Sequence, residues 1–427
     1  MHPRIHRRDF LRSASASVLL ARVPGLGGAL HAVTPRAQDR LLLTVYLRGG
    51  VDALNVVVPW SDPDYARIRP GIGIPSEDED GIPGVLKLDD RFGLHPALAP
   101  LMPHWKAGEL APIVCVGSPH PTRSHFDAQD FMEYAAPGIR SIKSGWLNRY
   151  LAATHATSSR SKLRALAMQK LLPRSLRGDH PVLAVPSRPG REVHRVLDEF
   201  EELFGAEDDR SPEAMGMGTR REEDSALQVG RDTIETLREL YRILDKQAED
   251  DRKKVVYPRG AMSAPLAGIA RVVKAQAGLE VACLDLAGWD THTNQGGAVG
   301  AMSRRLGDLA ASLAAFADDL GEHYERTLIL VMSEFGRTCH ENGNLGTDHG
   351  HGGCMLALGG AVGTQTVHGK FRGLDEKNLY QGRDLEVTTD FRVVFKEVLE
   401  QFLGFKPTGD FFPGWIPEKP LGFLKKG

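Results

Sequence analysis

The stretch TDHGHGG carries Asp348, His349 and His351 within four residues, between glycines. A second stretch, GWDTHTNQ, carries Asp290 and His292 directly after an apolar run. The Asp290/His292 and His349/His351 pairs are each spaced two residues apart, so in extended backbone the two side chains of a pair point the same way. Because imidazole combined with carboxylate suits transition metals, we predict a bound divalent cation, zinc or manganese before calcium or magnesium.

Other polar clusters follow apolar runs along the chain. Asp52 and Asn55 follow the first run, Ser124 and His125 follow the second, and Glu334 with Arg337 follows a later one. Ligands of open α/β sheets bind outside the carboxyl ends of the strands. We therefore expect several of these clusters to converge on one crevice.

Ser124 has two interpretations. With Asp127 three residues on, it is typical of a helix N-cap close to a capping box. It could equally be a nucleophile, since a helix N-terminus favours anions and a nearby cation would lower the pKa of the hydroxyl. Arg123 and Arg337 could then hold an oxyanion through paired hydrogen bonds, or could serve as structural ion-pair partners.

The elements that must position these residues form an alternating pattern. Short apolar runs typical of buried parallel strands alternate with helical patterns, which predicts an α/β fold with a mostly parallel central sheet and helices on both faces. The predicted strands span 41–47, 111–117, 280–288, 327–333 and 354–360, and the helical patterns span 95–110 and 303–324. A charged segment at about 156–260 predicts a helical insertion with a mobile loop near 209–219.

Composition restricts the function classes. The chain has 427 residues and a formal net charge of -2, so no basic field indicates nucleic-acid binding. After the N-terminus no segment has the roughly 20 apolar residues that a membrane-spanning helix needs. The four cysteines are scattered without metal-binding spacing, and we favour no disulfide pairing over free buried thiols.

The N-terminus has the pattern of an export signal. Arg7 and Arg8 precede Phe10 and a short apolar stretch, which resembles the twin-arginine signal. A membrane anchor is the alternative, although the stretch is short for a span. We predict a signal peptide over 1–38, a single mature domain over 39–427, and export by the twin-arginine translocase to the periplasm or the exterior.

Five motifs together resemble one family: LRGGVDALNVVVP, GSPHPTRSHFDAQDFME, GWDTHTNQ, MSEFGRT and GTDHGHGG. The mature chain is similar to an uncharacterised family of twin-arginine-exported proteins, the domain of unknown function 1501, placed in the alkaline phosphatase and sulfatase superfamily. That resemblance implies hydrolysis of phosphate or sulfate esters. It also implies a hydroxyl nucleophile at a helix start and one or two cations held by Asp and His at strand ends.

The resemblance also implies residue roles. Ser124 matches the nucleophile, and Glu334 falls where the enzymes have an Asp on a second cation. The implied metal ligands are Asp52, Asp290, His292 and Glu334, with His351 or His349 completing the first site and Asp348 or His349 available to the second. Phe335 stands where the enzymes usually carry His, and no Cys-x-Pro-x-Arg sulfatase signature is present. One cation or lost catalysis would both fit these departures.

The resulting expectation is an exported, metal-dependent hydrolase acting on a phosphate or sulfate ester of a small molecule or polysaccharide. Ser124 would be the nucleophile, and Arg337 would help to spread charge on the transferring group. The alternative is a catalytically inactive binding or envelope protein on the same scaffold, using the cation to hold its ligand.

Overall fold

The computed structural model describes residues 40–155, 163–186, 198, 220–250 and 255–425. The predicted signal peptide and the predicted mobile loop near 209–219 lie outside these residues. Within them, no helix is both long enough and apolar enough to cross a membrane. All four cysteines are free and buried.

The core of the fold is an eight-stranded sheet with the order β11-β5-β10-β9-β1-β8-β6-β7. Every neighbouring pair is parallel except those that involve β10. The prediction of a mostly parallel α/β sheet is therefore confirmed. The strands are β1 (Leu41–Arg48), β5 (Leu110–Gly117), β6 (Ala165–Ala167), β7 (Leu183–Ala184), β8 (Val281–Ala287), β9 (Thr327–Met332), β10 (Gly353–Leu358) and β11 (Thr389–Asp390).

One strand prediction is wrong in direction. The run at 354–360 forms β10, which is antiparallel to both β9 and β5. To run parallel to β9, β10 would need a crossover connection that returns the chain to the end of the sheet where β9 begins. The chain instead turns back from β9 through residues 333–352 without a helix. As a consequence, the TDHGHGG stretch lies at the edge where β1, β8 and β9 end.

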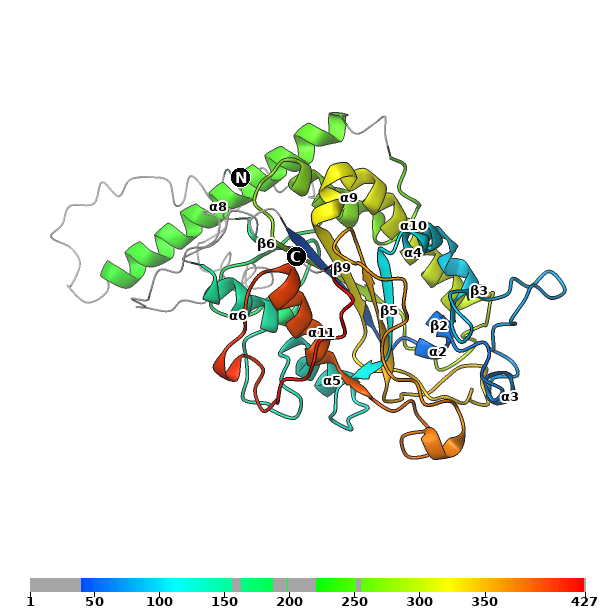
Figure 1. Ribbon diagram of the computed structural model, residues 1–427. Coiled ribbons are helices and arrows are strands. Elements are labelled where there is room, and N and C mark those ends of the chain that lie inside the picture. Colours follow the sequence, from blue (N-terminus) through cyan, green and yellow to red (C-terminus); the bar gives the residue numbers. More distant parts are fainter. Residues whose placement is uncertain (1–39, 156–162, 187–197, 199–219, 251–254, 426–427) are drawn as a thin grey trace, which may run out of the picture.

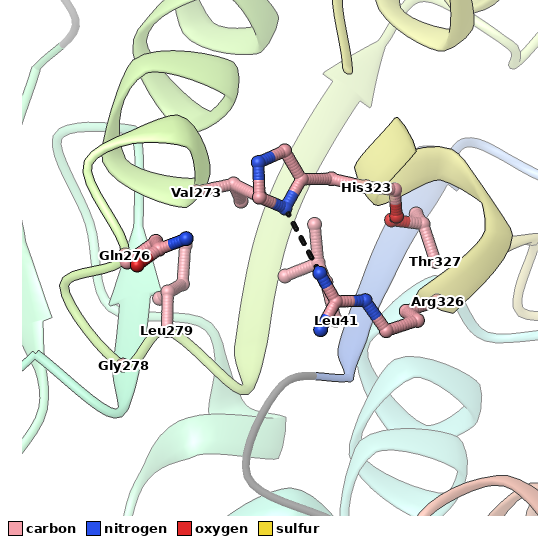
Figure 2. A pocket seen from close by; sticks show the side chains of 8 residues that line it. All are labelled: Leu41, Val273, Gln276, Gly278, Leu279, His323, Arg326 and Thr327. Atoms are coloured by element: carbon pink, nitrogen blue, oxygen red, sulfur yellow. Dashed lines mark hydrogen bonds between the residues drawn. The ribbon is translucent and has the colours of Figure 1, made fainter. Parts of the chain in front are cut away.

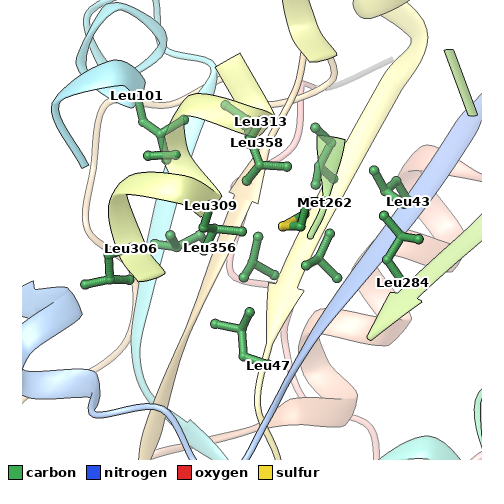
Figure 3. Packing of buried hydrophobic residues seen from close by; sticks show 14 of the residues in the cluster. Leu43, Leu47, Leu101, Met262, Leu284, Leu306, Leu309, Leu313, Leu356 and Leu358 are labelled. Atoms are coloured by element: carbon green, nitrogen blue, oxygen red, sulfur yellow. The ribbon is translucent and has the colours of Figure 1, made fainter. Parts of the chain in front are cut away.

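Helices cover both faces of the sheet (Figure 1). Alternate residues of β1 belong to two separate cores: Leu43 packs with α9, α10 and η2 residues, whereas Leu42 packs with α5, α6 and α11 residues. Figure 3 shows the first core, where Leu306, Leu309 and Leu313 of α10 face the strands. The leucine spacing of the predicted 303–324 helix therefore marks the face that is buried.

The longer helices are α4 (Met102–Lys106), α5 (His125–Glu133), α6 (Trp146–Ala153), α8 (Arg220–Asp250), α9 (Ser263–Lys274), α10 (Ala301–Leu320) and α11 (Phe391–Glu397). Short helices are α2 (Ala53–Val56) and α3 (Tyr65–Ile68). The 3-10 helices are η2 (Pro96–Leu101), η3 (Arg174–Leu176), η5 (Gly321–Arg326), η6 (Glu376–Asn378) and η8 (Gly409–Phe411), and η7 (Val398–Phe402) is a π-helical turn. A three-stranded sheet joins β2 (Val57–Val58), β4 (Gly93–Leu94) and β3 (Leu86–Lys87).

The segment at 156–260 is only partly the predicted helical insertion. It contains the long helix α8, whose Leu240 and Leu244 pack into the same core as Leu266 of α9. The same segment also supplies β6 and β7, which extend the central sheet beyond β8. These strands have three and two residues, too few for their apolar pattern to stand out in the sequence.

Candidate metal centre

Three imidazoles and one carboxylate converge beyond the carboxyl ends of the strands. Nε2 of His349 lies 3.0 Å from Nε2 of His125 and 3.0 Å from Nε2 of His292. The Asp290 carboxylate lies 3.0 Å from Nε2 of His292 and 3.2 Å from Nε2 of His349 through Oδ1, and 3.4 Å from Nε2 of His125 through Oδ2. Ligand atoms of His125, Asp290 and His349 all lie within 4.8 Å of one another, which is close enough to hold one metal ion.

Three separate loops deliver these groups. His125 is the first residue of α5, Asp290 and His292 follow β8, and His349 lies in the turn that leads into β10. The strands next to these loops, β5, β8 and β10, are not all neighbours in the sheet, so the loops must extend along its carboxyl edge to meet.

Glycines allow the loops to approach closely. Gly49 has a φ of 128°, and a Cβ there would lie 2.4 Å from the backbone nitrogen of Asp290. A Cβ at Gly350 would lie 2.4 Å from the carbonyl carbon of Arg337, where the two segments pair as a short antiparallel bridge. Gly350, which directly follows His349, therefore lets this turn pack against the loop that follows β9.

Each imidazole is held through Nδ1. His125 donates to Glu334 Oε1 at 2.8 Å, His292 donates to Asp348 Oδ1 at 2.8 Å, and His349 donates to the carbonyl oxygen of Arg123 at 2.9 Å. Carbonyl and carboxylate oxygens only accept hydrogen bonds, so the proton of each neutral ring sits on Nδ1 and its Nε2 is a bare lone pair. Metal-ligating histidines characteristically bond their second nitrogen in this way.

The donor set therefore fits a cation. When all three rings are neutral, their Nε2 lone pairs face one another across 3.0 Å, an arrangement that a bound cation would stabilise. Tetrahedral coordination at about 2.0–2.1 Å would place two imidazole nitrogens roughly 3.3 Å apart, close to the separations seen here. Imidazole nitrogens together with a carboxylate oxygen suit transition metals, whereas calcium and magnesium favour oxygen-only sites.

The charges around the site match this arrangement. Burial acts to raise the pKa of Asp290, but the hydrogen bond and charge of Arg337 outweigh it and hold the carboxyl below its usual value. Burial also lowers the pKa of His349, which favours the neutral ring. The hydrogen bond that His125 donates to Glu334 raises the pKa of that imidazole. Asp290 is ready to bind as an anion.

Arg337 does not occupy the predicted oxyanion position. Its side chain is buried, with 1% exposure for the residue, and it donates to Asp290 Oδ1 at 2.7 Å. Its other donors bond the Thr347 hydroxyl at 3.2 Å, the Thr347 carbonyl at 2.6 Å and, more weakly, the Gly49 carbonyl at 3.4 Å. Burial therefore turns this guanidinium toward the protein, where it orients Asp290. Arg123 is likewise engaged, in an ion pair with Asp384 at 2.5 Å.

Two predicted ligands, Glu334 and Asp348, accept hydrogen bonds from the Nδ1 atoms of the imidazoles. Glu334 is buried, and its Oε1 accepts from His125, from Gln129 at 2.9 Å and from the Gly49 nitrogen at 2.9 Å. Asp348 accepts from His292, and this hydrogen bond holds the pKa of Asp348 below its usual value. Both carboxylates therefore support ring orientation in this structure.

Two other predicted ligands lie apart from the imidazole cluster. Asp52 is buried and pairs through both oxygens with Arg69, at 2.5 and 3.0 Å. His351 is 7% exposed and stacks on Tyr380 with ring centroids 4.3 Å apart. Burial lowers the pKa of His351 to about 4. The structure therefore completes the donor set with His349 rather than His351.

Ser124 occupies the N-cap position of α5, but the predicted capping box is not formed. Its side chain makes no capping hydrogen bond, and Asp127 pairs with Arg140 at 2.8 Å instead of reaching back. The exposed Ser124 precedes His125 directly, so it lies beside the candidate site. Its role as nucleophile stays a prediction.

Two residues at the site were not among the ligands predicted from the sequence. His125 was noted only as a neighbour of Ser124, although an imidazole that follows a strand at the shared edge was a usable signal. Phe335 packs on the rings of His125 and His349, with centroid distances of 4.9 and 5.2 Å. A phenyl ring offers no ligand, so this position contributes packing where the resembling enzymes carry His.

A separate pocket of about 160 Å³ lies at the opposite edge of the sheet. Figure 2 shows Leu41 and Thr327, the first residues of β1 and β9, together with His323 and Arg326. Because the candidate metal centre lies where the strands end, the two sites are distinct.

Fold and site together define a mixed α/β protein with a candidate His/Asp cation centre at the carboxyl edge of its sheet. The chain matches, over residues 39–406, the family described as "Protein of unknown function (DUF1501)", and it belongs to that family. Searches of curated proteins and of solved structures gave no significant match.

Proposed function

We propose that this protein is an exported, metal-dependent hydrolase of phosphate or sulfate esters, with one divalent cation held by His125, Asp290, His292 and His349. The observation that carries the proposal is the convergence of three imidazole Nε2 atoms, on rings that are each bonded to an acceptor oxygen at Nδ1. Catalytic metal sites differ from structural ones in keeping a coordination position open. Exposure supports an open position here, since the side chains of Asp290 and His292 are 43% and 42% exposed.

Membership of the alkaline phosphatase and sulfatase superfamily is part of the proposal. Its support is the α/β architecture, together with ligands that come from loops at the carboxyl edge of the sheet. Phe335 offers no ligand, and Glu334 is occupied by His125, Gln129 and Gly49. We therefore propose one cation rather than two.

The chain's own residues define the chemistry. The bound cation would act as a Lewis acid toward the ester oxygens and lower the pKa of a nearby hydroxyl or water. Arg337 fixes Asp290, while Glu334 and Asp348 fix His125 and His292. The proposed nucleophile is the Ser124 hydroxyl: its oxygen would bond to phosphorus or sulfur while the ester bond breaks and the alcohol leaves, and water would then release the inorganic anion.

Metal analysis and hydrolysis assays on the same preparation test this proposal. Purified mature protein should contain about one equivalent of zinc or manganese and should cleave an aryl phosphate or an aryl sulfate. His292→Ala combined with His349→Ala should remove most of the metal, whereas His323→Ala at the opposite edge should retain it. Full metal content in the double variant would contradict the site.

A second function has one observation in its favour. Arg337 faces inward, where its donors bond Asp290 and Thr347, so this arginine is not free to clamp an oxyanion. A cation-dependent binding or envelope protein on this scaffold would need no such clamp. Metal-loaded protein that is inert toward both ester classes but binds an anionic or hydroxyl-rich polymer only with its metal would support this alternative.

Export is a further part of the proposal and rests on the paired arginines of the N-terminal segment. Replacing Arg7 and Arg8 with Lys should leave the precursor in the cytoplasm, because the twin-arginine translocase reads that pair. Cell fractionation with an antibody to the mature domain would measure it. Unchanged export of the Lys-Lys variant would contradict the assignment.

A further inference from the structure

A row of buried polar side chains runs inward from the candidate metal centre. Arg337, which holds Asp290, donates through Nε to the Thr347 hydroxyl at 3.2 Å. That hydroxyl donates to Gln295 Oε1 at 2.8 Å, and Gln295 Nε2 donates to Asp52 Oδ2 at 2.6 Å. Arg337, Thr347, Gln295 and Asp52 are each no more than 1% exposed.

The direction of every bond in this row is fixed. The carboxylate of Asp52 only accepts, so Gln295 must present its amide nitrogen to it and its oxygen to Thr347. Thr347 must then donate to that oxygen, which leaves a lone pair of the hydroxyl free to accept from Arg337. Thr291 donates to the same amide oxygen at 2.6 Å and reinforces this orientation.

The row ends at the ion pair of Asp52 and Arg69, which several hydrogen bonds hold in place. Arg69 donates to both oxygens of Asp52 and also to the backbone carbonyls of Thr338 and Cys339, at 2.9 and 2.8 Å. Thr338 and Cys339 follow Arg337 in the chain, so the same ion pair anchors the loop that carries Arg337. A negative charge at Asp52 thus holds both the side-chain row and the backbone in one arrangement.

We propose that Asp52, Gln295 and Thr347 are positioning residues that act through Arg337 to fix the Asp290 carboxylate, and so set the affinity and geometry of the cation site. This inference rests on the cation site proposed above. Asp52 was expected from the sequence to bind the cation directly. Here it acts on the cation site through Arg337 and does not contact the cation. Partners one step removed from a metal ligand typically contribute 10–100-fold to metal affinity.

The test compares Asp52→Asn with Glu280→Gln. Glu280 is buried and pairs through both oxygens with the buried Arg164, at 2.9 and 2.7 Å, just before β8 at the opposite edge of the sheet. Each variant removes one buried charge of an arginine–carboxylate pair, so both should lower the melting temperature of chelator-treated protein. Only Asp52→Asn should weaken Zn²⁺ binding, by about tenfold, in a titration against a competing chelator.

Co²⁺ supplies a readout that a loss of stability alone would not change. The visible absorption of bound Co²⁺ depends on its coordination geometry, so the spectrum should shift in Asp52→Asn and stay unchanged in Glu280→Gln. If Asp52→Asn does not fold, Thr347→Val should weaken Zn²⁺ binding and Thr347→Ser, which keeps the hydroxyl, should restore it.

The cation site and the positioning role can be refuted separately. Wild-type protein that binds neither Zn²⁺ nor Co²⁺ would overturn the cation site itself. If Asp52→Asn, or Thr347→Val in its place, binds Zn²⁺ with the same affinity as wild type and gives the same Co²⁺ spectrum, only the positioning role is overturned. Equal weakening in Asp52→Asn and Glu280→Gln would likewise overturn it, because the effect would then follow from stability alone.

Discussion

Replacing Glu334 with Gln tests whether the carboxylate behind His125 supports cation binding. The amide keeps the size of the side chain and can still accept through its oxygen. It removes the negative charge whose hydrogen bond raises the pKa of His125. His125 should become a less basic ligand that is held less firmly.

The magnitude follows from the contacts. Because Glu334 orients a proposed ligand directly, at 2.8 Å, cation affinity should fall by about 10–100-fold. That corresponds to about 1.4–2.8 kcal/mol of binding free energy, and at saturating cation the stability gained on binding falls by the same amount. An unfolding entropy of about 2.1 cal/mol/K per residue, over a domain on the order of 350 residues, converts this loss into roughly 2–4 °C.

Thermal unfolding with and without a chelator measures the effect. The relevant quantity is the rise in melting temperature on adding Zn²⁺, because this difference removes any loss of intrinsic stability. Glu133→Gln is the matched control: Glu133 is also buried and also on α5, but it pairs with Arg48 at 2.7 Å and contacts none of the imidazoles. An equal Zn²⁺-dependent rise in wild type, Glu334→Gln and Glu133→Gln would refute the reasoning.

Three further predictions concern individual side chains. Ser124→Ala should abolish ester hydrolysis with metal content unchanged and should cost little stability, since its hydroxyl makes no capping bond; an active variant with normal turnover would reject the nucleophile. His351→Asn should leave Zn²⁺ affinity within about twofold of wild type, because the ring stacks on Tyr380 away from the cluster; metal loss in this variant would restore His351 to the ligand set. Zn²⁺ affinity should rise with pH and keep rising above about 6.5, because His125 has a raised pKa and must lose its proton before Nε2 can bind; affinity that is flat from pH 6 to 8, measured by competition, would exclude that ring as a ligand.

Much of the fold could be predicted from local pattern. The five apolar runs that became β1, β5, β8, β9 and β10 are long enough to be recognised, and the leucine spacing of α10 gave the buried face of that helix. The direction of β10 could not be predicted, because it depends on whether the chain after β9 returns to the opposite end of the sheet or turns back at once. That choice placed His349 at the metal edge.

The candidate site was predictable in its residue types and only partly in its membership. Asp290, His292 and His349 followed from spacing near strand ends, and the structure brings them together. The participation of His125 and the pairing of Asp52 with Arg69 did not follow, because these depend on which partner lies within about 3 Å.

The sequence by itself determined that carboxylates and imidazoles would gather where strands end, since these residues directly follow the apolar runs. Only the tertiary structure decided that Asp52 pairs with Arg69 and that Glu334 accepts the hydrogen bond of His125. The physical reason is that hydrogen bonding and pKa depend on ångström-scale distances. Those distances are set between loops more than 200 residues apart in the case of His125 and Glu334, where local propensity has no influence.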